Sequence, residues 1–260
     1  GEINRYRYGK SWLRLLLLKF MQNRSLNSAN GVIFLTKYAS EIIQKSCGKL
    51  ENYKIIPHGV GREFKNQKIL SKWPSKANEQ ISCLYISNTA PYKHQWKVIK
   101  AVKQLNDQGF NLKLTLAGAK GEAHGMVENA IKECNGEQFV NFLGHVKKSQ
   151  LPMLLANSNV FIFASSCENL PNTLIESMCL GLPIACSDRG PMPEVLNGAG
   201  VYFDPENIQS IKKSIEKIII DKELRKRIAR KAKKKSEKYS WNRCANETMG
   251  YVTKTIINTK

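Results

Sequence analysis

The chain has 260 residues, of which 42% are apolar, and a formal net charge of +20. This length and apolar content allow one large domain or two modest ones around a buried core, and they exclude an intrinsically disordered chain. No apolar run approaches the roughly 20 residues of a membrane-spanning helix. The charge favours a polyanionic partner, which is nucleic acid, an anionic membrane surface or a phosphate-bearing substrate.

The seven cysteines are odd in number and scattered, without a CxxC pair. This argues against a disulfide framework or a zinc site and favours a reducing compartment, with most of the cysteines in the core. The chain begins with Gly-Glu rather than Met, which suggests a processed or shortened chain. No small-residue cleavage pattern follows the apolar stretch 12–20, so we do not expect a signal peptide.

Residues 1–65 predict a basic amphipathic helix followed by one β-α-β unit. Residues 5–20 interleave Arg and Lys with Trp, Leu and Phe. This pattern fits a helix at a membrane interface, and equally a packed helix whose cations reach solvent. Strands are expected at 31–35 and 53–56, around a helix at 37–46. The sequence turns polar from residue 62, and we assign 66–80 to a linker.

From residue 81 onward, strand and helix signals alternate. Strands are expected near 81–87, 112–117, 140–143, 160–164, 183–186 and 201–203, with helices near 95–107, 126–134, 149–156 and 173–180. This alternation predicts an α/β fold with a doubly wound, Rossmann-like parallel sheet over 81–240. A basic helical tail covers 211–238, and a last helix occupies 241–260. Such a sheet binds its ligand at the carboxyl ends of its strands, where strand order reverses.

The segment 164–183 is the most informative one for function. It leaves a buried strand, passes through a loop that holds Glu168, and enters a helix near Asn172, so that Glu176 falls in the first turn. A helix start binds phosphate, and a carboxylate one turn in suits a ribose diol. The alternative is that Asn172 and Glu176 only cap the helix and favour its dipole.

The spacing of Glu168 and Glu176, followed by Ser-Met-Cys-Leu-Gly-Leu-Pro, resembles the Glu-x7-Glu signature of family 4 glycosyltransferases, which have the GT-B fold. Further resemblances follow in the family's order at 32–36, 55–60, 92–94, 116–118, 140–146, 188–194 and 239–241. They cover most of residues 31–255. The resemblance implies that 81–240 is the C-terminal, nucleotide-sugar-binding domain. Residues 1–65 would then be the end of an N-terminal acceptor domain, largely absent here, toward which 241–260 packs back.

The resemblance also implies the roles of individual residues. Glu168 would contact the donor sugar, and Lys93 would neutralise the departing diphosphate. Glu176 would bind the ribose. The donor-binding residues implied in this way are Glu176, Asn88, Thr89, Asn169, Leu170, Thr173, Leu174, His145, Val146 and Gly118. Within this set the backbone near Thr173 would hold the diphosphate, and the backbone near His145 would border the nucleobase.

The chain departs from the family at one clear position. The family pattern Gly-Arg-Leu-x-x-x-Lys-Gly has an Arg five residues before the Lys, where this chain has Asn88. An Asn cannot supply the charged bidentate fork of an Arg. Either Lys93 works with another cation, such as Arg189, or diphosphate binding is weaker.

The implied reaction is retaining transfer of a glycosyl group from a UDP- or GDP-sugar to a glycan or lipid-linked acceptor. The chain has no Asp-x-Asp pair and no His/Cys cluster with ligand spacing. We therefore predict no metal and no cofactor. His58 ends a strand and His94 begins a helix, so either is a candidate for lining the cleft.

Two other functions compete with this interpretation. The charge suggests a nucleic-acid-binding protein, but aromatic residues do not accompany the basic tail and no nucleic-acid-binding motif appears, so nucleic acid is not the expected partner. The basic helix suggests a donor-binding or membrane-docking subunit that needs a partner. We expect a cytoplasmic protein of surface-polysaccharide synthesis, peripheral at the inner face of the membrane.

Overall fold

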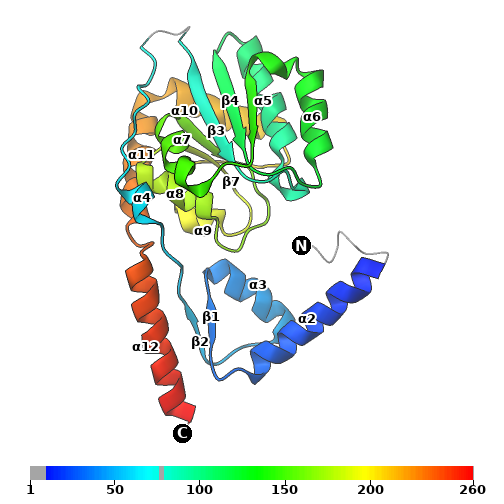
Figure 1. The fold of residues 1–260 in the computed structure, drawn as a ribbon, viewed down its shortest axis with the longest axis vertical. Coiled ribbons are helices and arrows are strands. Elements are labelled where there is room, and N and C mark those ends of the chain that lie inside the picture. The colour runs from blue at the N-terminus through cyan, green and yellow to red at the C-terminus, as the bar shows by residue number, and fades with distance from the viewer. Residues whose placement is uncertain (1–9, 76–78, 260) are drawn as a thin grey trace. The chain divides into compact units, whose positions relative to one another are not determined.

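The computed structural model describes residues 10–75 and 79–259, and the chain divides into two compact units. The larger unit runs from Val60 to Tyr239, and the smaller one joins the described residues up to Gly59 with those from Ser240 (Figure 1). Each unit has its own sheet, of six and of two strands.

The larger unit is built on a parallel sheet of six strands. They are β3 (Ile81–Ile86), β4 (Leu112–Ala117), β5 (Val140–Gly144), β6 (Val160–Phe163), β7 (Ile184–Ser187) and β8 (Val201–Phe203). Their order is β5-β4-β3-β6-β7-β8, and all neighbouring pairs are parallel. The predicted α/β fold with a doubly wound sheet is confirmed. Because chain order reverses between β3 and β6, the crevice at their carboxyl ends is where such folds bind ligands.

The burial of the strands explains why the sequence forms this sheet. Every residue of β6 and β7 is buried, whereas the edge strand β5 has no buried residue. Parallel strands that are covered on both faces read as continuous apolar runs such as Val-Phe-Ile-Phe in β6. The hydrophobic effect therefore places β3, β6 and β7 at the centre.

Helices cover both faces of this sheet (Figure 1). One group comprises α5 (Gln95–Asp107), α6 (His124–Glu133) and α10 (Ile208–Ile220), in which α5 packs against the other two. The other group comprises α7 (Leu151–Ala156), α8 (Asn172–Leu180), α9 (Met192–Leu196) and α11 (Lys222–Ser236), in which α8 contacts all three others. Short 3₁₀ turns lie at Pro91–Lys93 (η1), Gly136–Gln138 (η2) and Lys148–Gln150 (η3).

The basic tail, expected as one helical region over 211–238, forms two separate helices. Asp221 ends α10 in an extended conformation, and its side chain accepts a hydrogen bond from the Leu224 N–H at 2.8 Å. An Asp at this position is a preferred N-cap because it satisfies an otherwise unpaired helix donor. The break therefore has a local cause in the sequence.

Residues 60–75 pack on the larger unit, although a linker was expected over 66–80. Helix α4 (Arg62–Lys65) contacts α8, and the N–H groups of Leu70 and Ser71 both donate to the Ala156 carbonyl, at 2.8 and 3.0 Å. The Arg225 guanidinium lies 3.5 Å from the centre of the Trp73 ring. The boundary between the compact units thus falls at residue 60 rather than in 66–80.

The smaller unit contains α2 (Lys10–Ser28), β1 (Val32–Phe34), α3 (Lys37–Cys47), β2 (Tyr53–Ile55) and α12 (Trp241–Thr259). Strands β1 and β2 are parallel, as expected for a β-α-β unit. Val32, Phe34 and Leu50 form its small core. The Tyr251 hydroxyl of α12 accepts from the Val32 N–H at 3.2 Å, which ties the last helix to β1.

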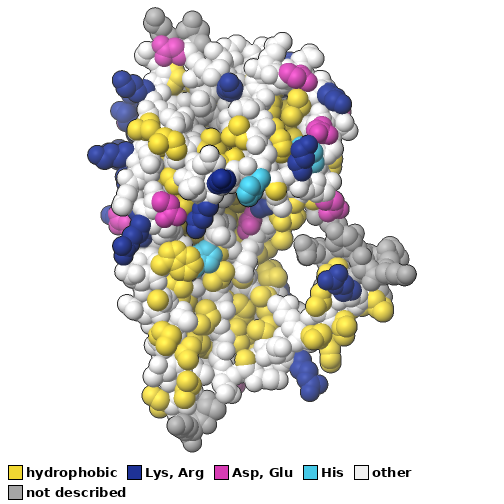
Figure 2. All heavy atoms as spheres, viewed as in Figure 1, with side chains coloured by type: hydrophobic (Ala, Val, Ile, Leu, Met, Phe, Trp, Pro, Cys, Tyr) yellow, Lys and Arg dark blue, Asp and Glu magenta, His cyan; other side chains and the backbone are white. Residues whose placement is uncertain are grey.

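Helix α2 covers part of the predicted basic helix, whose residues 5–9 lie outside the described residues. Hydrophobic side chains lie at the surface of both α2 and α12 (Figure 2). Leu13 and Phe20 of α2 and Met249 of α12 are among the exposed ones. The apolar side chains are therefore not confined to a packed face of α2. Among the described residues, no helix combines the length and apolar content that crossing a bilayer requires.

Candidate functional site

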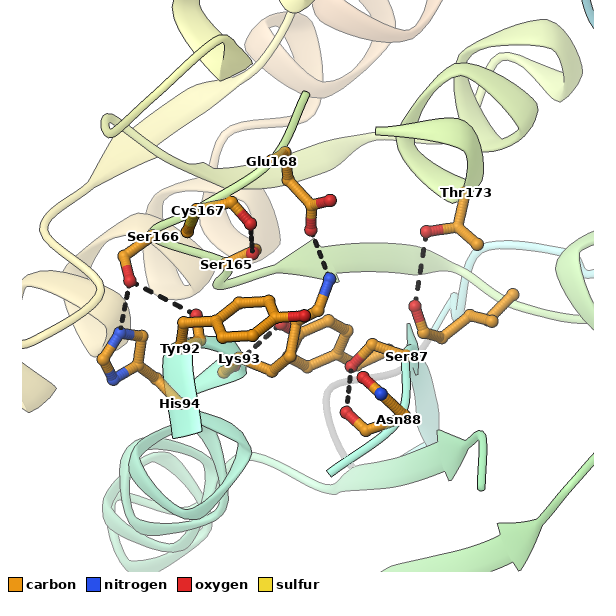
Figure 3. Close-up of polar contacts among 12 residues, drawn as sticks. Ser87, Asn88, Tyr92, Lys93, His94, Ser165, Ser166, Cys167, Glu168 and Thr173 are labelled. Carbon is orange, nitrogen blue, oxygen red and sulfur yellow. Dashed lines mark hydrogen bonds and ion pairs between the residues drawn. The ribbon is translucent and has the colours of Figure 1, made fainter. Parts of the chain in front are cut away.

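The site lies at the switch in strand order, between the loop after β3 (residues 87–94) and the loop after β6 (residues 164–171). Across it, the Lys93 ammonium forms an ion pair with the Glu168 carboxylate (Figure 3). The two side chains are only 11% and 17% exposed. An ion pair with so little solvent around it is far less screened than a surface pair. The fold thus brings together two expected site residues that lie 75 positions apart.

Contacts from β3 and β6 fix the position of Lys93. The buried Tyr85 hydroxyl donates to the Lys93 carbonyl at 2.7 Å, and burial raises the pKa of Tyr85 well above its ordinary value. The ammonium also lies 5.1 Å from the centre of the Tyr92 ring and 5.6 Å from that of Phe163. Cations are attracted to ring faces at such distances. Both the backbone and the ammonium group of Lys93 are therefore held.

The two loops are joined directly to one another. The Ser166 N–H donates to the Tyr92 carbonyl at 2.8 Å, and His94 Nε2 lies 3.0 Å from Ser166 Oγ (Figure 3). The sequence made His94 a candidate for the cleft but assigned no role to Ser166. Their pairing spans 72 residues, so no local pattern could have revealed it.

The N-cap residue of α8 provides no capping side chain. This residue is Pro171, which has no side-chain hydrogen bond to the helix, and Asn172 is the first helical residue. The Thr173 hydroxyl donates instead to the Ile86 carbonyl of β3 at 3.3 Å. The interpretation of Asn172 as an N-cap is therefore wrong. The first N–H groups of a helix that lacks such a cap are candidates for binding an anion.

Glu176 lies in the second turn of α8, not in its first turn as expected, because the helix begins at Asn172. Burial is the main reason that the pKa of Glu176 is raised from 4.5 to about 7; the charge of Lys148 lowers it and the charge of Glu63 adds to the rise. One carboxylate oxygen is buried without a hydrogen-bond partner among the described residues. A buried acceptor without a donor is unfavourable and is therefore ready to bind one.

Gly118 holds three strand ends close together. Its φ of +149° lies in the region that favours glycine, and a Cβ there would be 2.0 Å from the Ser87 carbonyl oxygen. The Gly118 N–H donates to the Gly144 carbonyl at 2.7 Å. This close backbone approach aligns the loops after β3, β4 and β5.

The remaining expected donor-binding residues fall into two groups. Thr89, Leu170 and Leu174 are buried, and the Thr89 hydroxyl accepts from the Gly121 N–H at 2.6 Å. These three offer their backbone rather than their side chains. The residues with exposed or half-buried side chains are Asn88, His145, Val146, Asn169 and Thr173.

Arg189, the candidate replacement for the missing Arg at position 88, is engaged elsewhere. Its guanidinium contacts Asp204 at 3.2 Å and Asp188 at 3.4 Å. The adjacent Gly190 lies beside the loop that carries Glu168. Arg189 would have to leave both aspartates to compensate for Asn88.

Two further observations concern where a ligand or a metal ion could bind. A hollow of about 440 Å³ lies at the amino ends of β4 and β5, lined by Lys103, Asp107 and Gln138 among others, at the opposite edge of the sheet. Within the described residues, no three His, Cys, Asp or Glu side chains are grouped so that they could hold a metal ion.

The model of the family described as "Glycosyl transferases group 1" matches residues 66–235. O-antigen chain mannosyltransferase B of Escherichia coli is 26% identical over 64% of this chain and 44% of its own length. The capsular polysaccharide biosynthesis glycosyltransferase CapM of Staphylococcus aureus is 24% identical over 86% of this chain and 61% of its own. The chain therefore spans about half the length of these curated relatives.

A solved structure shows the same fold. Anabaena HepE in complex with UDP and glucose superposes with a TM-score of 0.79 at 19% identity, over 97% of this chain and 69% of that one. The GT-B architecture expected from the sequence is thereby confirmed for the fold.

Proposed function

Because this chain belongs to the glycosyl transferases group 1 family, we propose that it carries the donor-binding domain of a retaining, metal-independent hexosyltransferase of the family 4 type. The donor is a UDP- or GDP-sugar, and the acceptor is a glycan or a lipid-linked glycan. One observation carries the proposal: Lys93 and Glu168 meet across the β3–β6 crevice, beside the uncapped start of α8.

The diphosphate binds between the start of α8 and Lys93. The helix start supplies backbone N–H groups near Thr173 and a positive dipole end, and Lys93 supplies a full charge. As the diphosphate takes over Lys93, Glu168 is released from its ion pair. Its carboxylate then accepts hydrogen bonds from the hydroxyl groups of the donor sugar. Glu176, with its unpartnered oxygen, accepts from the ribose.

The chemical contribution of the protein is stabilisation of charge on the departing diphosphate. Negative charge accumulates there as the bond to the sugar breaks, and preorganised donors act most strongly on charge that develops in the transition state. Lys93 and the α8 start are held in place before the reaction by Tyr85 and by β3. This arrangement supports leaving-group stabilisation without a metal ion.

We propose sugar transfer as the activity of the whole protein to which this chain belongs. In that protein, the smaller unit forms the end of the acceptor domain. The similarity to O-antigen and capsular polysaccharide transferases supports a role in surface-polysaccharide synthesis. Exposed apolar side chains on α2 lie among Arg14, Lys19 and Arg24, and this mixture supports a peripheral position at the inner membrane face.

Calorimetric titration of the chain with UDP and GDP tests the proposal. Binding of at least one nucleotide is expected, unchanged by EDTA and strongly weakened in Lys93→Met. Glu137→Gln, an exposed carboxylate in η2 at the other end of the sheet, is the matched control and should bind like the wild type. If neither nucleotide binds, or if Lys93→Met binds as the wild type does, the donor site is wrongly placed.

A further inference from the structure

His94 has a backbone conformation that its side chain must help to maintain. It follows Lys93 directly, precedes α5, and has φ 49° and ψ 28°. This left-handed region is unfavourable for a residue with a Cβ, and the family pattern places Gly at this position. Yet His94 is only 6% exposed. A buried, non-glycine residue in this conformation indicates that specific contacts hold it there.

Those contacts lie on the opposite loop of the crevice. His94 Nε2 is 3.0 Å from Ser166 Oγ, and Ser166 Oγ is 3.3 Å from the Tyr92 carbonyl oxygen. A serine hydroxyl has one hydrogen, and the carbonyl can only accept it. With the Ser166 hydroxyl donating to the Tyr92 carbonyl, the matching tautomer of His94 donates its Nε2–H to Ser166 Oγ. The Ser166 N–H adds a second bond to the same carbonyl.

The positions of these residues along the chain explain why the contact between His94 and Ser166 affects Lys93. Lys93 lies between Tyr92 and His94, the two residues that Ser166 joins, and Glu168 lies two residues after Ser166 (Figure 3). The backbone at Lys93 is thus fastened to the opposite loop on both sides. A movement of either loop would separate the Lys93 ammonium from the place where Glu168 and the donor meet.

We propose that His94 and Ser166 are positioning residues: their contact across the β3–β6 crevice holds Lys93 where it meets the donor diphosphate. This inference rests on the proposed function. It matters more in this chain than in one with the family's Arg, because Asn88 brings no charge. Polar groups that act on a transition state must be placed within a fraction of an ångström, so loosely joined loops would lower donor affinity.

Four variants and one control test the proposal. His94→Gly removes the ring and also relieves the backbone strain, so it should fold well. Ser166→Ala removes the hydroxyl but keeps the backbone bond to Tyr92, and Ser166→Thr keeps a hydroxyl. The fourth variant combines His94→Gly with Ser166→Ala. Asn135→Gly is the matched control, since Asn135 has the same φ of 49° at the opposite end of the sheet, before η2.

Titration with UDP and GDP gives the first measurement. For the nucleotide that binds, His94→Gly and Ser166→Ala are each expected to lose about tenfold in affinity. The double variant should lose no more than either single one, because both break the same contact. Ser166→Thr and Asn135→Gly should bind like the wild type. Additive losses, or an unchanged affinity in His94→Gly, would overturn the proposal.

Peptide-resolved hydrogen exchange gives the second measurement and needs no nucleotide. His94→Gly should speed amide exchange in the peptide 164–171 on the opposite loop by about fivefold, and leave the exchange rate of β7 unchanged. Unchanged exchange in 164–171 would show that the loops are not coupled through His94. If the wild type binds no nucleotide, the proposed function fails, while the exchange result still decides whether the contact joins the loops.

Discussion

Replacing Glu176 with glutamine is expected to stabilise the larger unit at pH 8 and to weaken donor binding at the same pH. The carboxyl group is held largely away from water on α8, and burial raises its pKa to about 7. Near neutral pH and above, the folded chain must therefore hold a charge that burial disfavours. A neutral amide of the same shape removes this penalty.

The pKa sets the size and the pH range of the effect. Because the folded chain holds the proton more tightly than the unfolded chain, the stabilising contribution is complete below about pH 4.5 and is lost as the pH rises through about 7. At about 1.4 kcal/mol for each pH unit, the limit is about 3 kcal/mol. Partial solvent access to Glu176 reduces the expected gain in Glu176→Gln to about 1–2 kcal/mol at pH 8. At pH 5 the variant and the wild type should differ little.

Donor binding should change in the opposite direction. Ribose hydroxyls donate to the ionised carboxylate, so wild-type affinity for a nucleoside diphosphate sugar should fall as the pH drops below about 7. A hydrogen bond to a charged group contributes about 1.5–3 kcal/mol, so Glu176→Gln should bind about 10- to 100-fold more weakly at pH 8. Its affinity should also vary little with pH. General damage to the fold would not raise stability while it lowers affinity.

Unfolding is measured by urea titration at pH 5 and pH 8. Amide exchange in peptides from β6 serves as the readout, so that the larger unit is observed alone. Glu137→Gln serves as the control at both pH values. A stability difference between Glu176→Gln and the wild type that is equal at pH 5 and pH 8 would refute the raised pKa. An affinity that does not change in Glu176→Gln would refute the role of this residue at the ribose.

Three further outcomes are expected. Cys167 is exposed and precedes Glu168 in the loop. A saturating nucleotide should therefore slow the alkylation of Cys167 by iodoacetamide severalfold, as measured by mass spectrometry, and an unchanged alkylation rate would place the donor elsewhere. Lys93→Met should weaken nucleotide binding by about 2–3 kcal/mol in calorimetry, because a charge-assisted hydrogen bond is lost. Binding as strong as that of the wild type would exclude a contact between Lys93 and the phosphates. Trp73→Ala should lower the free energy of unfolding of the larger unit in urea by about 2 kcal/mol, because a desolvated cation–π contact with Arg225 is removed. Nucleotide affinity should stay unchanged, and a loss of affinity would show that this contact is not separate from the site.

Local sequence patterns predicted most secondary-structure elements of the larger unit closely, because their signals are short-ranged. The apolar run of β6 and the alternation around α5 were recognised to within a residue or two. The expectations failed where tertiary contacts decided the outcome. Residues 66–75 look like a polar linker, but Trp73 packs under Arg225, which lies some 150 positions further along the chain. One error had a local cause instead: Asn172 looks like an N-cap, but the preceding Pro171 takes that position.

For the candidate site, too, some features were predictable from local sequence and others depended on tertiary structure. The sequence by itself determined that Glu168 and Glu176 flank a helix start after a buried strand, because the continuous segment 160–176 contains all of that information. Only the tertiary structure decided that β3 lies beside β6, and that Lys93 therefore meets Glu168 and His94 meets Ser166. The physical reason is that strand order depends on how all six strands share one core. No residue carries that property alone, so the partners across the crevice appear only when the sheet is assembled.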